Sequence, residues 1–282
     1  MSIDLHTHSY YSDGSDSPEE IVQKGAALGL RAIALTDHDN TDGVKEFMEA
    51  GQSAGILAIP GVEISASYRG RDIHILGYGF RYEQPDFADR LRSIREERQR
   101  RNEAMLLRLQ QLGYAITKED IERYSGGEGH VISRLHFAQA LTEKGYCRDT
   151  NEAFDQIVGT GCPGYIPRQQ LSPEEAIGLI HGAGGKAVLA HPLLYKLNED
   201  ECAVLLKFAA SAGMDGLEVI HSTCDAKGTL FLQERARALG LFCTGGSDYH
   251  GENKQEVPLG VGYNGRPIPD SYLEPLQHTG VV

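Results

Sequence analysis

Cysteine is scarce in this sequence, and its few cysteines do not pair. The chain has 282 residues and five cysteines, at positions 147, 162, 202, 224 and 243. None of them has a CxxC-type spacing to another, and the count is odd. This pattern argues against a disulfide framework and against a zinc–thiolate site. We interpret the five as ordinary thiols, buried or partly buried.

Basic residues are also in short supply. Lysine and arginine together number 27, aspartate and glutamate 40, and the net charge is −13. Sequence-independent binding to long nucleic acid relies on a basic surface, so we do not expect that kind of partner. A small anionic substrate remains compatible with the composition, because bound divalent cations reverse the local charge inside a site.

Long apolar runs are missing as well. The chain starts with Met1-Ser2-Ile3-Asp4 and continues directly into polar and charged residues. The sequence therefore predicts neither a signal peptide nor a membrane-spanning segment. We expect a cytoplasmic protein without a membrane partner.

Short β-rich apolar runs alternate with helical patterns, which is typical of an α/β fold with a mostly parallel sheet. The pattern predicts seven strands, over residues 3–8, 32–37, 57–64, 72–78, 187–191, 216–220 and 242–248. Ser17 and Ser172 each precede Pro-Glu-Glu, which predicts two capped helix starts. Gly29, Gly55 and Gly240 stand where a helix should end before a strand.

Two stretches interrupt this alternation. Too few residues separate Glu63 from His74 for a crossover helix, so we expect a hairpin there. Residues 85–165 read as helical throughout. We predict a barrel domain made of residues 1–84 and 166–282, and a helical insertion, 85–165, that caps the substrate site. We interpret the basic run 95–101 as a solvated helix face, because Glu96 and Glu97 interrupt it.

Residues that commonly bind metals gather at the predicted strand ends. His6 and His8 are two residues apart in the first predicted strand, so their side chains lie on the same face of it. The carboxyl ends of barrel strands meet at one rim, where active sites form. His and carboxylate ligands suit manganese, zinc or iron. We therefore predict two or three divalent ions, held by residues from this rim: His6, His8, Asp13, His38, Glu63, His74, His191, Asp248 and His250.

These motifs resemble those of the PHP family, named for polymerase and histidinol phosphatase. The resemblance spans nearly the whole chain and rests on residues 4–8, 36–39, 61–63, 74, 190–192 and 247–250. It implies a distorted (β/α)7 barrel with a trinuclear metal centre. In that arrangement His6, His8, Glu63 and Asp248 hold the first ion. Glu63 then bridges to a second, and the remaining ligands complete the set: His74 and His191 on the second ion, and Asp13, His38 and His250 on the third.

Residues 132–137 and 161–165 resemble a subgroup that acts on nucleoside 3′,5′-bisphosphates and short RNA ends. On that basis we expect Ser133, Arg134 and His136 to contact substrate. Arg134 is the expected phosphate clamp, with a solvated helix cation as the alternative. The subgroup often has lysine where this chain has Cys162. We expect Arg168 to replace the phosphate contact that this lysine would make.

Several neighbouring residues receive weaker assignments. We expect Asp37 to orient His38 from behind the metal site. Glu218 ends the sixth strand and either faces the site or has a structural role. His221 and His130 are ambiguous between site and scaffold. His181 and His278 have no expected role in the chemistry.

The leading functional hypothesis is a phosphatase that removes the 3′-phosphate of nucleoside 3′,5′-bisphosphates. Water between two dications has a lowered pKa and can attack phosphorus, so the ligands His6, His8, Glu63 and Asp248 are catalytic in this scheme. His191 or His250 would protonate the leaving group only if free of metal. The alternatives are a 5′→3′ exonuclease on short RNA or DNA, a histidinol-phosphate phosphatase, and a non-catalytic metal-binding module.

Overall fold

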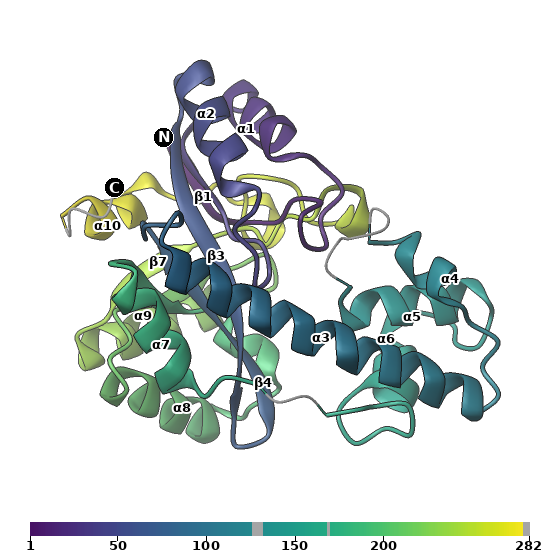
Figure 1. Ribbon diagram of the computed structural model, residues 1–282. Coiled ribbons are helices and arrows are strands. Elements are labelled where there is room, and N and C mark those ends of the chain that lie inside the picture. The colour runs from purple at the N-terminus through teal and green to yellow at the C-terminus, as the bar shows by residue number, and fades with distance from the viewer. Residues whose placement is uncertain (126–131, 168–169, 279–282) are drawn as a thin grey trace.

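A computed structural model describes residues 1–125, 132–167 and 170–278 of the chain (Figure 1). Its centre is a seven-stranded sheet in which the strand order β1 to β7 follows the sequence. The strands are β1 (Ser2–Thr7), β2 (Leu30–Leu35), β3 (Leu57–Tyr68), β4 (Arg71–Tyr78), β5 (Lys186–Leu189), β6 (Gly216–Ile220) and β7 (Phe242–Gly245). The seven predicted strands are thus confirmed, although β3 runs four residues beyond the predicted end at residue 64.

Strand β4 runs against the rest of the sheet. It pairs antiparallel with both β3 and β5, whereas the other neighbouring strands pair in parallel. The predicted hairpin between Glu63 and His74 is confirmed, with Ser65 opposite His74. Because of this reversal, the beginning of β4 lies at the rim where its neighbours end. The expectation of a strand-end ligand is therefore wrong for His74, which lies in the first half of its strand.

The sheet curves until its two outer strands meet at the ligand-bearing rim. The His8 amide donates to the Tyr249 carbonyl at 2.9 Å, and the Asp248 amide donates to the His6 carbonyl at 2.9 Å. No ladder joins β1 to β7 among the described residues, and the parallel bridge on this side is formed by Thr7 and Tyr249, which lies beyond the end of β7. The predicted α/β fold with a distorted seven-stranded barrel is borne out in this form.

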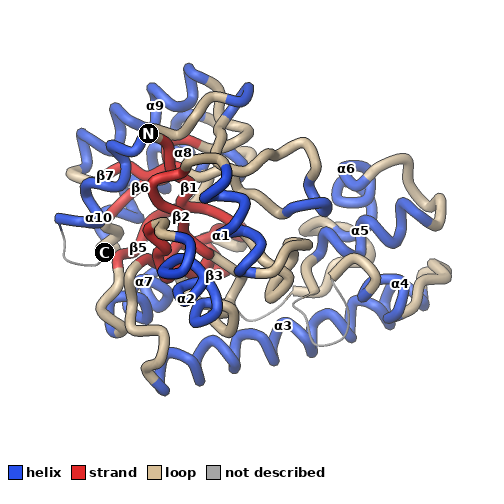
Figure 2. Tube along the Cα trace, turned by 90° about the horizontal axis from the view of Figure 1, so that it is seen from above, coloured by secondary structure: helices blue, strands red, loops and turns tan. Residues whose placement is uncertain are grey.

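Helices cover the outside of the curved sheet, and Figure 2 shows the strands enclosed by them. The predicted capped starts are confirmed: Ser17 forms a capping box with Glu20, and Ser172 forms one with Glu175. The helices around the barrel are α1 (Pro18–Ala27), α2 (Val44–Ala54), α7 (Pro173–Gly182), α8 (Glu199–Ser211) and α9 (Ala226–Leu239), and a short α10 (Glu274–His278) follows them.

The barrel interior is filled by small and branched apolar side chains from alternate strand positions. Ile3 and Leu5 of β1, for example, are fully buried there. At the end opposite the ligand-bearing rim, Ile268, Leu273 and Leu276 of the C-terminal segment pack against this core. Inward-facing positions are thus apolar along most of each strand and become polar only at the rim, where the site forms.

The insertion begins with a long helix, α3 (Pro85–Gln111), which runs from the barrel to a separate group of short helices (Figure 1). That group comprises α4 (Lys118–Glu122), α5 (Arg134–Glu143), α6 (Thr150–Ala153) and a π-helical turn (Phe154–Val158). It has its own apolar cluster, which includes Met105, Leu109 and Phe137. Division of the chain into barrel and insertion domains stays a prediction.

One stripe of α3 is buried along its whole length. It starts with Phe87 and Leu91 and ends with Met105 and Leu109. At spacings of three and four residues, the stripe also includes Arg98 and Arg101, which are only 6% and 7% exposed. The interpretation of residues 95–101 as a solvated face is therefore wrong for these two arginines. Among the described helices, none is both long and apolar enough to cross a membrane.

Candidate metal centre

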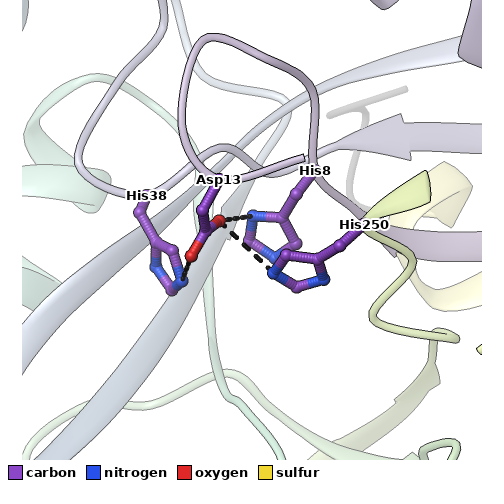
Figure 3. Close-up of side chains that lie close together, drawn as sticks. All are labelled: His8, Asp13, His38 and His250. Atoms are coloured by element: carbon purple, nitrogen blue, oxygen red, sulfur yellow. Dashed lines mark ion pairs between the residues drawn. The ribbon is translucent and has the colours of Figure 1, made fainter. Parts of the chain in front are cut away.

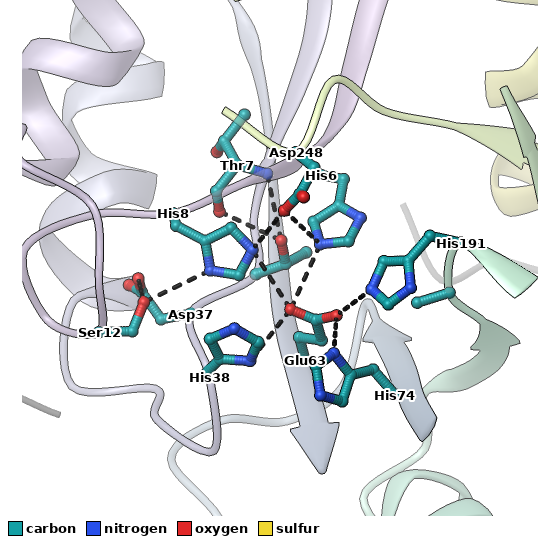
Figure 4. Close-up of polar contacts among 12 residues, drawn as sticks. His6, Thr7, His8, Ser12, Asp37, His38, Glu63, His74, His191 and Asp248 are labelled. Atoms are coloured by element: carbon teal, nitrogen blue, oxygen red, sulfur yellow. Dashed lines mark hydrogen bonds and ion pairs between the residues drawn. The ribbon is translucent and has the colours of Figure 1, made fainter. Parts of the chain in front are cut away.

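Glu63 lies at the middle of the site and faces five imidazoles (Figure 4). Its Oε1 atom is 2.8 Å from Nδ1 of His74 and 2.9 Å from Nε2 of His191. The Oε2 atom faces a second group of rings, with distances of 3.4 Å to Nε2 of His6, 3.3 Å to Nε2 of His8 and 3.1 Å to Nδ1 of His38. One carboxylate, 1% exposed, thus connects ligands that come from β1, β2, β4 and β5 or from the residues that follow them.

Asp248 completes the group of rings that faces Oε2 of Glu63. Its Oδ1 atom lies 3.5 Å from Nε2 of His6 and 3.3 Å from Nε2 of His8. Tetrahedral ligands at about 2.1 Å from one ion lie about 3.4 Å from each other. The four contacts that Glu63 and Asp248 make with these two histidines have this spacing, which is longer than an ordinary hydrogen bond. The donor arrangement thus fits a divalent ion at this position.

A second grouping is centred on Asp13 (Figure 3). Its carboxylate oxygens lie 3.3 Å from Nε2 of His250, 3.6 Å from Nε2 of His38 and 3.7 Å from Nδ1 of His8. One ligand atom from each of these four residues lies within 4.8 Å of the others. Three further groups meet the same limit, and they overlap with this group or with one another: His6, His8 and Asp248; His6, Glu63 and His191; His38, Glu63 and His74.

Several buried ligand atoms form no hydrogen bond within the described part of the chain. They are Nε2 of His6, Nε2 of His8, Oδ1 of Asp13, Nδ1 of His38 and Oε2 of Glu63. Buried polar atoms are nearly always satisfied, because an unpaired one costs about 1–3 kcal/mol. Divalent ions bound in the groups described above would satisfy these atoms. The orphaned atoms are therefore a second, independent sign that the residues present fit a metal cluster.

Electrostatics point the same way. Burial lowers the pKa of His38 to about 3, so this ring is neutral and able to ligate near neutral pH. Burial also opposes ionisation of Glu63, but the surrounding imidazoles outweigh it and hold the pKa of the carboxyl well below its usual range. For His8, burial opposes protonation, yet the carboxylates of Asp248 and Glu63 raise its pKa to about 10. The two carboxylates therefore favour a positive charge at this position, which a bound dication would supply.

The ligands are held from behind by further buried groups. Glu218, in the middle of β6, accepts from Nδ1 of His6 at 2.9 Å and from the backbone amide of His191 at 2.7 Å. Of the two roles left open for Glu218, the structure thus places it against the site. A carboxylate on the far ring nitrogen fixes the orientation of a ligating histidine.

Asp248 is supported in the same manner. Its Oδ2 atom lies 3.2 Å from Nε2 of His221 and 2.6 Å from Nζ of Lys254. This leaves Oδ1 directed at His6 and His8. His221 directly follows β6, as other ligand-bearing residues follow their strands, and that position is the sequence signal that could have assigned it to the site.

Asp37 does not take the position expected for it. Instead of contacting His38, it accepts from the backbone amide and hydroxyl of Ser9 at 2.8 and 2.6 Å, and from the hydroxyl of Ser12 at 2.6 Å. Ser12 Oγ lies 3.4 Å from Nδ1 of His8. The expected link to His38 is wrong, because the tight turn after β1 folds back over Asp37 and occupies both of its oxygens.

Backbone strain concentrates on the same rim. His191 and Asp248 have φ values of 26° and 63°, in the left-handed region that side chains other than glycine rarely adopt. Residues held there cost about 1–3 kcal/mol each and persist where the surrounding structure enforces them. Two of the nine predicted ligands therefore carry strain that a purely structural strand end would avoid.

A pocket of about 190 Å³ opens beside the cluster. From the barrel rim it is lined by Asp13, His38 and His74, and from the insertion by Arg98, Arg101, Ser133, Arg134, Phe154 and Tyr165, among others. The insertion thus lies over the ligand-bearing rim, as predicted. The Arg134 guanidinium pairs with Asp72 and lies 5.8 and 5.7 Å from the ring centres of Phe154 and Tyr165.

The other predicted substrate residues have different surroundings. Ser133 caps helix α5, and its hydroxyl accepts from the Leu135 amide at 3.2 Å. His136 is fully buried, and its Nδ1 accepts from the Ser133 amide at 3.2 Å, so it supports the start of α5 and does not line the pocket. The thiol of Cys162 donates to the Asp155 carbonyl at 3.2 Å. Arg168 and His130 lie outside the described residues.

Comparisons with known proteins agree with this geometry. A model of the PHP domain matches residues 4–133. A 3′,5′-nucleoside bisphosphate phosphatase from Chromobacterium violaceum is 36% identical over 258 residues, which cover 91% of this chain and 90% of that protein. The chain belongs to the PHP family. A 5′-3′ exoribonuclease from Haemophilus influenzae is 32% identical, and the match covers 88% of this chain and 89% of that protein.

A solved structure extends the match to the whole fold. It comes from Bifidobacterium adolescentis and is described as a candidate metal-dependent phosphoesterase. The two chains are 32% identical and superpose with a TM-score of 0.82, and the match covers 98% of this chain and 95% of the B. adolescentis chain. Together with the His, Asp and Glu cluster, these relatives make this PHP protein a metal-dependent phosphoesterase and thus a hydrolase. This excludes the non-catalytic module that the sequence left open.

Proposed function

We propose that this PHP enzyme is a phosphatase that removes the 3′-phosphate of nucleoside 3′,5′-bisphosphates. The observation that carries the proposal is the position of Arg134. It lines the same small pocket as the ligands His38 and His74, so a second phosphate on one substrate would meet a guanidinium while the first lies at the cluster. The C. violaceum relative, which covers nearly the whole chain, is named for this reaction.

The proposed metal ligands follow from the groupings above. His6, His8, Glu63 and Asp248 would hold one ion, and Glu63 would share a second with His74 and His191. A third would lie among Asp13, His38 and His250, with His8 also in reach. Nitrogen and carboxylate donors suit manganese, zinc or iron. Divalent ions bound there would supply Lewis-acid charge and a water of lowered pKa.

The side chains of the chain itself divide the remaining work. Glu63 keeps two groups of imidazoles together, so the reacting phosphate meets a rigid and preorganised wall. Arg134 can hold the other phosphate, because a guanidinium has five N–H donors and pairs with phosphate in bidentate fashion. Phe154 and Tyr165 line the same pocket and offer aromatic faces for a base.

A panel of substrates tests this assignment. Purified protein with added Mn²⁺ would be given adenosine 3′,5′-bisphosphate, a short 5′-phosphorylated oligoribonucleotide and histidinol phosphate, and the products would be identified. We expect the bisphosphate to give adenosine 5′-monophosphate and free phosphate at the highest kcat/KM. Preferred turnover of histidinol phosphate, or release of the 5′-phosphate, would contradict the proposal.

Substitution of Arg134 tests its role in substrate choice. We expect Arg134→Ala to lower kcat/KM for the bisphosphate by about 100-fold, which corresponds to loss of about 3 kcal/mol from one charge-assisted contact. Turnover of an aryl phosphate, which has no second phosphate, should fall by less than about threefold. Arg123→Ala, which removes an exposed ion pair with Glu143, is the matched control in the insertion. Equal losses on both substrates would show that Arg134 does not read the second phosphate.

A 5′→3′ exonuclease is the second candidate, and the similarity to the H. influenzae exoribonuclease favours it. The same cluster would then act on a phosphodiester at the 5′ end of a short strand. The oligonucleotide in the panel distinguishes the two candidates, since stepwise release of mononucleotides is expected only from an exonuclease.

A further inference from the structure

Arg98 connects the insertion to the metal centre. It sits on the buried stripe of α3, and its Nη2 atom donates to Oδ2 of Asp39 at 2.5 Å and to Oγ of Ser65 at 2.8 Å. These two acceptors flank the ligands in sequence, because Asp39 follows His38 and Ser65 lies two residues beyond Glu63. One guanidinium thus joins β3 to the loop after β2, the two segments that carry His38 and Glu63.

Asp39 links the Arg98 contact to the backbone around the predicted ligand Glu63. Its backbone amide donates to the Glu63 carbonyl at 2.9 Å, and its Oδ1 atom accepts from the Ser65 amide at 2.8 Å. The residue has a φ of 50°, so its backbone is in the left-handed region that aspartate adopts only with support. Asp39 is fully buried, and Arg98 supplies the cation that compensates its carboxylate.

An arginine is an unusual choice for this position. The buried stripe of α3 is apolar at its two ends but polar in its middle, where Arg98 lies close to Arg101 and Asn102. Burial of a cation costs free energy unless it is well paired. Nε of Arg98 is also buried and forms no hydrogen bond within the described residues. If this position only packed α3 on the barrel, leucine or methionine would suit it better than arginine.

We propose that Arg98 is a positioning residue for the metal centre, which holds His38 and Glu63 in their ligating arrangement through Asp39 and Ser65. The inference rests on the metal ligands proposed above. It makes the insertion part of the metal centre as well as of the substrate pocket, which Arg98 also lines. The metal set would then be assembled correctly only when α3 is docked on the barrel.

Titration of metal-free protein with Mn²⁺ against a fluorescent chelator tests this role. We expect Arg98→Met to weaken Mn²⁺ binding by about 10- to 100-fold, as is usual when a group that orients metal ligands is removed. Arg95→Met is the matched control, because Arg95 contacts the same loop through the Asp39 carbonyl, Asn40 and Asp42 but not the Asp39 carboxylate. It should keep the wild-type affinity within about threefold.

A kinetic readout separates positioning from substrate contact. Activity of Arg98→Met should return toward the wild-type value as Mn²⁺ is raised, whereas Arg134→Ala should stay impaired at every Mn²⁺ concentration. Asp39→Asn removes the same ion pair with little change of shape, and it carries the test if Arg98→Met does not fold. The double variant should be no worse than the more severe single variant, because both changes break one contact.

The outcomes distinguish this inference from the function on which it rests. If folded Arg98→Met, or Asp39→Asn in its place, binds Mn²⁺ with wild-type affinity and stoichiometry, Arg98 does not position the ligands. If the wild-type protein itself binds no Mn²⁺, Zn²⁺ or Fe²⁺, the metal centre is wrong and the inference fails with it.

Discussion

The shared carboxylate of Glu63 makes one substitution especially informative. Glu63→Gln keeps the size and shape of the side chain but removes the charge that faces five imidazoles. Because the structure places Glu63 between two groups of ligands, we expect this single change to weaken two ions together. A carboxylate that served only one ion, or none, would not have this effect.

The expected size follows from linkage between binding and folding. An ion present at about 100 times its Kd adds about 2.7 kcal/mol to the free energy of unfolding. With an unfolding entropy of about 2.1 cal/mol/K per residue, this raises the Tm of a chain of this length by about 4–5 °C per ion. If Glu63→Gln weakens each ion by about 100-fold, the same concentration gives about 0.4 kcal/mol per ion, or less than about 1 °C.

The assay is thermal unfolding of chelator-treated protein, with and without Mn²⁺. Wild-type protein should gain about 9 °C from the two ions that share Glu63, and Glu63→Gln should gain about 1 °C. Asp215→Asn is a suitable control, because it breaks a partly buried ion pair with Lys186 at the opposite end of the strands. Its Tm should fall without metal, but its gain from Mn²⁺ should equal that of wild type. A full gain in Glu63→Gln would refute the central position of this carboxylate.

Two further predictions concern catalysis and pH. His8→Ala should abolish hydrolysis of both the bisphosphate and an aryl phosphate. It should also release at least one equivalent of metal, measured by atomic emission. Retained metal together with full activity on either substrate would contradict the role of His8 as a metal ligand. In metal-free protein, burial opposes ionisation of Asp215, but contacts with Lys186, the Ala187 amide and His181 outweigh it and lower the pKa of this carboxyl. The stabilisation from the ionised carboxylate is therefore fully present above the pKa of the unfolded state, and it is lost as pH falls through the pKa of the folded state. Asp215→Asn should therefore cost about 1–3 kcal/mol at pH 7 by denaturant unfolding, and the difference from wild type should shrink below about pH 4; a difference that persists unchanged at pH 3 would show that the charge is not involved.

Much of the metal centre could be predicted from the sequence because its residues are tied to local structure. His6 and His8 share a face because strand side chains alternate with a period of two. Asp248 and His191 follow strands that the apolar pattern already marks, and parallel strands bring their ends to one rim. The convergence of these residues therefore needed only strand positions and topology. The predicted hairpin likewise followed from a connection too short for a helix.

Tertiary packing decided what lies around the ligands. Residues 95–101 have the composition of an exposed helix, and only the docking of α3 on the barrel determines that Arg98 faces inward toward Asp39. The turn after β1 decided that Asp37 supports the His8 side of the site rather than His38. His136 became a buried support for α5 because its ring caps the start of its own helix. Contacts of this kind join residues far apart in the chain or depend on which side of a helix is covered, and periodicity specifies spacing along an element but not the partner that covers it.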